Sequence, residues 1–105
     1  MNTLAHFDFI MNKVPPQNLD TFILSGCSAG GLATYYWADY LRGMLLSKND
    51  KLTFFGLPDS GFFIDYKSSE TNDNSFKLKM QNMFTLTNTE VDMPNSDCVK
   101  AYPGN

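Results

Sequence analysis

Apolar residues near the start of the chain recur every three or four positions, with polar residues between them. The apolar positions are Leu4, Phe7, Ile10, Met11 and Val14. This spacing places them on one face of a helix, so it predicts an amphipathic helix over residues 3–13. Pro15 and Pro16 end that helix, because proline has no N–H to donate and restricts the residue before it.

Two short runs of apolar and β-branched residues predict strands over residues 21–25 and 52–56. The first run is typical of a strand that is buried on both faces of a parallel sheet. Between the runs, apolar residues at helical spacing predict a helix from residue 29 to about residue 47. Gly43 within it indicates close packing against a neighbouring element. This order of elements predicts an α/β fold with one right-handed, parallel β-α-β crossover.

The second half of the chain has weaker patterns. Residues 57–66 form an aromatic segment punctuated by acidic residues, which we expect to leave the second strand as a loop. Residues 67–75 are polar and rich in turn-forming residues. Apolar residues between Phe76 and Phe84 predict a third helix, and the tail over residues 91–105, with two prolines and a glycine, is expected to be irregular.

Composition and charge narrow the range of functions. With 105 residues, of which 43% are hydrophobic and 14% aromatic, the chain is one small unit that can bury a core. A formal net charge of −3 without a basic cluster argues against nucleic acid or an anionic membrane as a partner. No apolar run approaches the roughly 20 residues of a membrane span, and the N-terminal residues lack the pattern of a signal peptide. Cys27 and Cys98 lack metal-ligand spacing, so no metal or other cofactor is predicted.

The stretch Leu24–Leu32 carries the clearest chemical signal. It contains Gly26-Cys27-Ser28-Ala29-Gly30 between the first predicted strand and the second predicted helix, which is the pattern of a nucleophile elbow. A sharp turn at this point would expose the Ser28 hydroxyl as a nucleophile and direct the Ala29 N–H toward a developing oxyanion. The alternative is a glycine-rich turn whose serine caps the helix.

A serine nucleophile needs a base, and the sequence offers little choice. The single histidine, His6, precedes Ser28, whereas this architecture has the order serine, acid, histidine. His6 is either an exposed residue at the start of a helix or a base at the catalytic edge of the sheet. Gly31 stands where a Ser-x-x-Lys motif would require lysine, so that arrangement is not present.

Other candidates follow the second predicted strand. Asp59 comes just after its end, where ligands bind in open α/β sheets, or it forms an Asp-Ser-Gly turn. Asp65 has the same two interpretations. Phe62 and Phe63 either wall a substrate pocket or belong to the core.

Two of these motifs together resemble a known family. Residues 24–34 are similar to the nucleophile segment of the pectin acetylesterase/Notum family of carboxylesterases. Residues 59–65, Asp-Ser-Gly-Phe-Phe-Ile-Asp, resemble that family's Asp-[Ala/Ser]-Gly-[Phe/Trp]-Phe-Leu-Asp signature. Residues 93–98 are similar to a family stretch of the form Leu-Pro-x-x-Cys. The resemblance spans nearly the whole chain.

The resemblance implies an α/β-hydrolase fold and a secreted serine esterase without a cofactor. Members remove acetyl groups from pectin or, in the Notum branch, a fatty acyl group from a signalling protein. By this resemblance Ser28 is the nucleophile, the Ala29 N–H is one oxyanion-hole donor, and Asp59 is a structural or pocket-wall residue. Cys27 is like the pectin acetylesterase branch, whereas Ser60 after Asp59 is like Notum, so the branch stays open. No bond between Cys27 and Cys98 is expected, because Cys98 would pair with a cysteine that these residues lack.

The family's upstream glycine-rich oxyanion loop and its catalytic acid and histidine have no counterpart here. Residues 1–105 are therefore expected to be a single fragment of an α/β-hydrolase domain, inactive or nearly so. Unpaired sheet edges would favour self-association. The alternatives are a Notum-like protein deacylase and a non-catalytic remnant that binds glycan or protein. A different α/β hydrolase, such as a lipase or peptidase, is disfavoured by residues 59–65.

Overall fold

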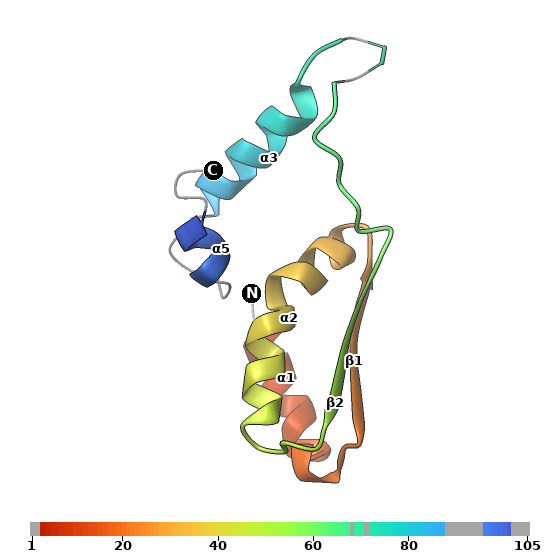
Figure 1. The fold of residues 1–105 in the computed structure, drawn as a ribbon, viewed down its shortest axis with the longest axis vertical. Coiled ribbons are helices and arrows are strands. Elements are labelled where there is room, and N and C mark those ends of the chain that lie inside the picture. The colour runs from red at the N-terminus through yellow and green to blue at the C-terminus, as the bar shows by residue number, and fades with distance from the viewer. Residues whose placement is uncertain (1–2, 68, 71, 88–95, 102–105) are drawn as a thin grey trace.

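A computed structural model of the chain describes residues 3–67, 69–70, 72–87 and 96–101 (Figure 1). Its elements, in chain order, are α1 (Thr3–Lys13), the short 3-10 helix η1 (Pro16–Asn18), β1 (Thr21–Cys27), α2 (Ala29–Leu46), β2 (Thr53–Asp59), α3 (Ser75–Leu86) and α5 (Ser96–Ala101). The first helix therefore has the bounds that the apolar spacing predicts, and the second ends one residue early.

The two strands form a parallel pair that is connected by α2, so the predicted β-α-β unit is confirmed (Figure 1). Pairing runs in register from Thr21 beside Thr53 to Cys27 beside Asp59. Phe22 of β1 pairs with Phe54 of β2, and the two rings stack with centroids 5.7 Å apart. The stacked rings therefore lie on the same face of the sheet.

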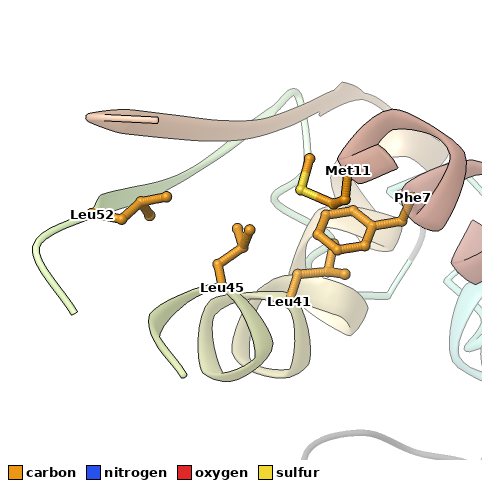
Figure 2. Packing of buried hydrophobic residues seen from close by; sticks show 5 residues of the cluster. All are labelled: Phe7, Met11, Leu41, Leu45 and Leu52. Carbon is orange, nitrogen blue, oxygen red and sulfur yellow. The ribbon is translucent and has the colours of Figure 1, made fainter. Parts of the chain in front are cut away.

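The core lies between this face of the sheet and the helices α1 and α2 (Figure 2). Its buried members are Phe7, Met11, Leu41, Leu45 and Leu52. Phe7 of α1 also meets Phe22 of β1 edge-on, at a centroid distance of 6.0 Å. Burial of apolar surface on one stripe of each helix is the main contribution to the stability of this unit.

The opposite face of the sheet is open, so the prediction of a strand buried on both faces is wrong. Exposure alternates strictly along β1, as it does in a strand with one covered face. Ile23, Phe55 and Leu57 point to the open face with 58%, 55% and 59% of their surface exposed. Within the described ranges of the chain, both helices that contact the sheet lie on its other side.

Both strands run past their predicted ends. β1 extends to Cys27, and β2 continues through Leu57 and Pro58 to Asp59, where a loop was expected. Proline usually breaks a strand because it donates no ladder hydrogen bond. Pro58 lies on a strand with a neighbour on one side only, beside Gly26, so a missing donor on the open side costs no pairing.

Gly43 does not mark a close contact, contrary to the prediction. It is exposed, and no heavy atom of another part of the protein lies within 4 Å of the position that a Cβ atom would take. Glycine at this position lowers helix propensity without a packing reason in the surrounding structure.

The predicted third helix is present as α3, which has no buried residue. Phe63 stacks on its Phe76 at 6.3 Å, and Asp65 pairs with its Lys77 at 3.0 Å. These contacts link α3 to the extended segment after β2, and Figure 1 shows the helix beyond the sheet. The salt bridge is half exposed, so it contributes less than about 1 kcal/mol.

The tail is not wholly irregular, because Ser96–Ala101 forms the short helix α5. Asp97 lies in its first turn and Lys100 in its last turn, with the Asp97 Oδ1 and Lys100 Nζ atoms 3.7 Å apart. The negative charge near the N-terminus and the positive charge near the C-terminus each interact favourably with the helix dipole. Six residues are too few for an apolar period to show in the sequence. The rest of the tail, 91–95 and 102–105, lies outside the described residues.

We expect Leu45→Ala to lower the free energy of unfolding by about 3 kcal/mol, because it removes a fully buried side chain and leaves a cavity. Leu45 has 0% of its surface exposed, whereas Leu86 is 86% exposed and supplies the matched control. Leu86→Ala is expected to change stability by less than about 0.5 kcal/mol. Urea unfolding followed by circular dichroism measures both, and equal losses would contradict the location of the core.

Candidate functional site

The backbone turns sharply at Ser28, directly between the last residue of β1 and the first residue of α2. Ser28 has φ 56° and ψ −113°, a conformation that residues with a side chain rarely adopt. Such strain costs of the order of 1–3 kcal/mol and persists only where surrounding contacts enforce it. The Ser28 carbonyl oxygen already accepts a hydrogen bond from the Leu32 N–H at 3.1 Å, so α2 begins with no intervening loop.

Gly26 makes this turn sterically possible. A Cβ atom at Gly26 would lie 2.4 Å from the carbonyl oxygen of Gly30, closer than any real contact, and the obstacle is backbone that cannot rotate away. A Cβ atom at Gly30 would meet no other part of the protein within 4 Å. Of the two glycines in the motif, the first is therefore required by the fold, and the second is not required by any described contact.

The Ser28 hydroxyl is not used as a helix cap. Ser28 occupies the N-cap position of α2 but makes no side-chain capping hydrogen bond, and the residue is exposed. This observation contradicts the alternative in which the serine serves to cap the helix. The first turn of α2 contains no acidic residue, and its first N–H groups, among them that of Ala29, have no partner within the helix.

A backbone hydrogen bond connects this turn to the end of β2. The Ser28 N–H donates to the carbonyl oxygen of Asp59 at 3.0 Å. Because Cys27 pairs with Asp59, Ser28 and Ser60 leave the two strands at the same edge of the sheet. Ser60 also has a positive φ, of 48°. Each of the two neighbouring strands is thus followed directly by a serine with a positive φ. Both serines lie at the edge where open α/β sheets bind ligands.

The structure separates His6 from Ser28. His6 lies on α1 next to Phe7, whose ring contacts Phe22 near the beginning of β1. Ser28 follows Phe22 by six positions along an extended strand, a length of about 20 Å. A base must lie within hydrogen-bond reach of the nucleophile, so His6 is not placed to activate Ser28.

The other predicted residues lie at the end of β2, which is Asp59, and in the segment after it. The Asp59 side chain is exposed and accepts a hydrogen bond of 3.4 Å from the Ser60 hydroxyl, while its backbone oxygen holds Ser28. Phe62 is 82% exposed. Phe63 instead packs on Phe76 of α3, and Asp65 pairs with Lys77 of the same helix.

Two glycines outside the predicted set also belong to this region. Gly31 in the first turn of α2 and Gly61 after β2 are both buried and lie backbone to backbone. A Cβ atom on Gly31 would be 2.7 Å from the Cα atom of Gly61. The only signal in the sequence is that each glycine belongs to one of the two motifs, and nothing there shows that the two motifs touch.

Within the described part of the chain there is no cysteine pair, no metal-binding group and no helix that could span a membrane. Cys27 is exposed and free, and the side chain of Cys98 lies outside that part. The described residues contain no group of three histidine, cysteine or acidic side chains that could hold a metal ion. None of the described helices has both the length and the apolar character of a membrane span.

Comparison with known proteins adds a family match. The family model of pectinacetylesterases matches residues 7–105, a range that includes the turn at Ser28 and the segment that starts at Asp59. No curated protein and no solved structure matches the chain.

We expect Gly26→Ala to lower the free energy of unfolding by about 3 kcal/mol, because its methyl group would overlap the Gly30 carbonyl. This value is the upper end of the usual cost of adding a methyl group to a packed site. Gly30→Ala is the matched control, and it should keep stability within about 1 kcal/mol of the wild type. Urea unfolding of both variants checks the turn geometry. A Gly26→Ala protein as stable as the control would show that the turn differs from the one described.

Proposed function

Because the chain belongs to the pectinacetylesterase family, we propose that Ser28 is the nucleophile of a serine carboxylesterase with an α/β-hydrolase fold. The observation that carries this proposal is the strained turn of Ser28 between β1 and α2, with a hydroxyl that is exposed and not used as a cap. The parallel β1-α2-β2 unit supports the fold, since a nucleophile elbow joins a strand to a helix in such a sheet.

In the proposed reaction, the Ser28 hydroxyl oxygen attacks the carbonyl carbon of an ester while a base takes its proton. The Ala29 N–H, which as the first of α2 has no partner within the helix, donates a hydrogen bond to the oxyanion that forms. The alcohol leaves with a proton, and water then attacks the acyl-serine to release the acid and restore the hydroxyl. The family name supports an acetyl ester of a cell-wall polysaccharide as the substrate and action outside the cell.

Phe62 is the residue that we assign to the substrate pocket. It directly follows Gly61, which lies against the first turn of α2, and its side chain is exposed. Phe63 packs on α3 and is assigned a structural role. Asp59 is also assigned a structural role, through the backbone oxygen that accepts the Ser28 N–H.

We propose that the 105-residue polypeptide by itself is inactive or nearly so. Its one histidine, His6, lies far from Ser28, so the described residues supply a nucleophile without a histidine base. Loss of triad members leaves only the residual catalysis of binding and oxyanion stabilisation. The same observation favours a second candidate, a non-catalytic polypeptide that binds glycan or protein. The open sheet face supports self-association in either case.

A fluorophosphonate probe tests the nucleophile, because it labels activated serines. We expect at most trace labelling of the polypeptide alone and an increase of at least about tenfold when imidazole is added as an external base. Ser28→Ala should abolish the labelling. Ser47→Ala, which removes a hydroxyl at the opposite end of α2, should leave it unchanged.

Each outcome separates the candidates. Strong labelling without imidazole would contradict the proposed inactivity. Absence of labelling that depends on Ser28, with and without imidazole, would contradict the nucleophile assignment and favour the binding polypeptide. Incubation of the unlabelled polypeptide and imidazole with an acetylated polysaccharide or an acylated protein would distinguish a deacetylase, which releases acetate, from a Notum-like deacylase, which releases a fatty acid.

A further inference from the structure

We propose that Gly31 and Gly61 are positioning residues, which hold the Ser28 turn against the end of β2 through direct contact of their backbones. This inference rests on the proposed function of Ser28 and names the part of the fold that sets its position. The two glycines lie 30 residues apart in the sequence, in different motifs.

The contact requires glycine at position 31 and is tight at position 61. A Cβ atom on Gly31 would stand 2.7 Å from the Gly61 Cα atom and 2.9 Å from the Asp59 carbonyl oxygen. A Cβ atom on Gly61 would stand 3.0 Å from the Pro58 Cβ atom and 3.2 Å from the Gly31 Cα atom. The obstacles at Gly31 are backbone atoms, so an added methyl group can be accommodated only if α2 and the segment after β2 move apart.

The turn at Ser60 brings this segment over α2. Its positive φ of 48° redirects the chain after Asp59, so that Gly61 lies buried on Gly31. The segment 59–61 thus holds the turn 28–31 at two points, by the hydrogen bond from the Ser28 N–H to Asp59 and by the glycine contact. One point fixes the Ser28 amide, and the other fixes the helix turn that begins with it.

A displacement at Gly31 is transmitted to the proposed chemistry over one turn of helix. Ser28 and Gly31 belong to the same turn, and Ala29, the proposed oxyanion donor, lies between them. Phe62 follows Gly61 directly, so the contact also sets the proposed pocket wall relative to the nucleophile. A misplacement of about 1 Å in a reacting group reduces rates on the order of 10²-fold.

The test compares three identical substitutions, Gly31→Ala, Gly61→Ala and Gly43→Ala. Gly43 lies in the same helix with open space around it, so its variant controls for the added methyl group and the higher helix propensity. Amide hydrogen exchange, followed by NMR on the 105-residue chain, measures the Ser28 N–H without requiring a reactive hydroxyl. Labelling by the fluorophosphonate probe with imidazole measures the reactivity of Ser28.

We expect the Ser28 amide of Gly31→Ala to exchange about tenfold faster than that of the control, the effect of weakening one hydrogen bond. The Gly61→Ala variant should show a smaller change, because its overlaps are milder. The amides of the paired strands should exchange as in the control. The rate of labelling should fall on the order of 10²-fold in Gly31→Ala.

Two results would overturn the inference. One is a Gly31→Ala variant whose Ser28 amide exchanges as in Gly43→Ala, and the other is faster exchange throughout β1 and β2, which would show a general loss of structure. If the wild type is not labelled even with imidazole, the proposed nucleophile role is wrong. Amide exchange still decides whether the glycine contact positions Ser28.

Discussion

The hydrogen bond from the Ser28 N–H to the Asp59 carbonyl oxygen joins the ends of the two strands, and the geometry of the candidate site depends on it. It can form only in the observed register, with Cys27 beside Asp59. A shift of β1 by one residue would turn Phe22 and Leu24 from the covered face of the sheet to the open one. The burial of apolar side chains on α1 and α2 therefore determines where Ser28 lies.

Stability and proposed chemistry occupy opposite ends of the same β-α-β unit. Leu41 and Leu45 are enclosed in the last turns of α2, whereas the strained serine precedes its first turn. At the core end, the Asn49 amide donates hydrogen bonds to the carbonyl oxygens of Pro16 and Leu19, at 3.0 and 2.9 Å, which ties the chain before β1 to the turn after α2. The packed end can thus offset the cost of the strained turn at the other end.

The elements with a local signal were predictable from the sequence. Apolar spacing and the prolines gave the bounds of α1, and the order of strand, Gly26-x-Ser28 and helix predicted the sharp turn. Other features depend on partners that are remote in the sequence. The contact of Gly31 with Gly61 joins two motifs, and Pro58 fits within β2 because one side of that strand has no neighbour.

The predictions that failed share a cause of the same kind. An apolar run cannot show whether one or both faces of its strand are covered, since that depends on elements elsewhere, so the exposure of Ile23 was missed. Gly43 looks in the sequence like a glycine at a close contact, and only the surrounding atoms show that its neighbourhood is empty. α5 is stabilised in part by a single pair of charges and has too few residues for a period.

The same distinction explains how the turn at Ser28, the proposed nucleophile, can form without a base beside it. The position of Ser28 follows from one strand, one helix and the segment after the next strand, all within residues 21–61. A base makes a different demand, because it must be brought within hydrogen-bond reach of the hydroxyl from another part of the fold, and His6 is held at the core end by the packing of α1. The backbone contacts that shape the turn do not involve the base, so the turn forms whether or not a base is present. The geometry of the turn therefore supports the proposal that Ser28 is the nucleophile, while the rate of the proposed reaction depends on the group that takes its proton.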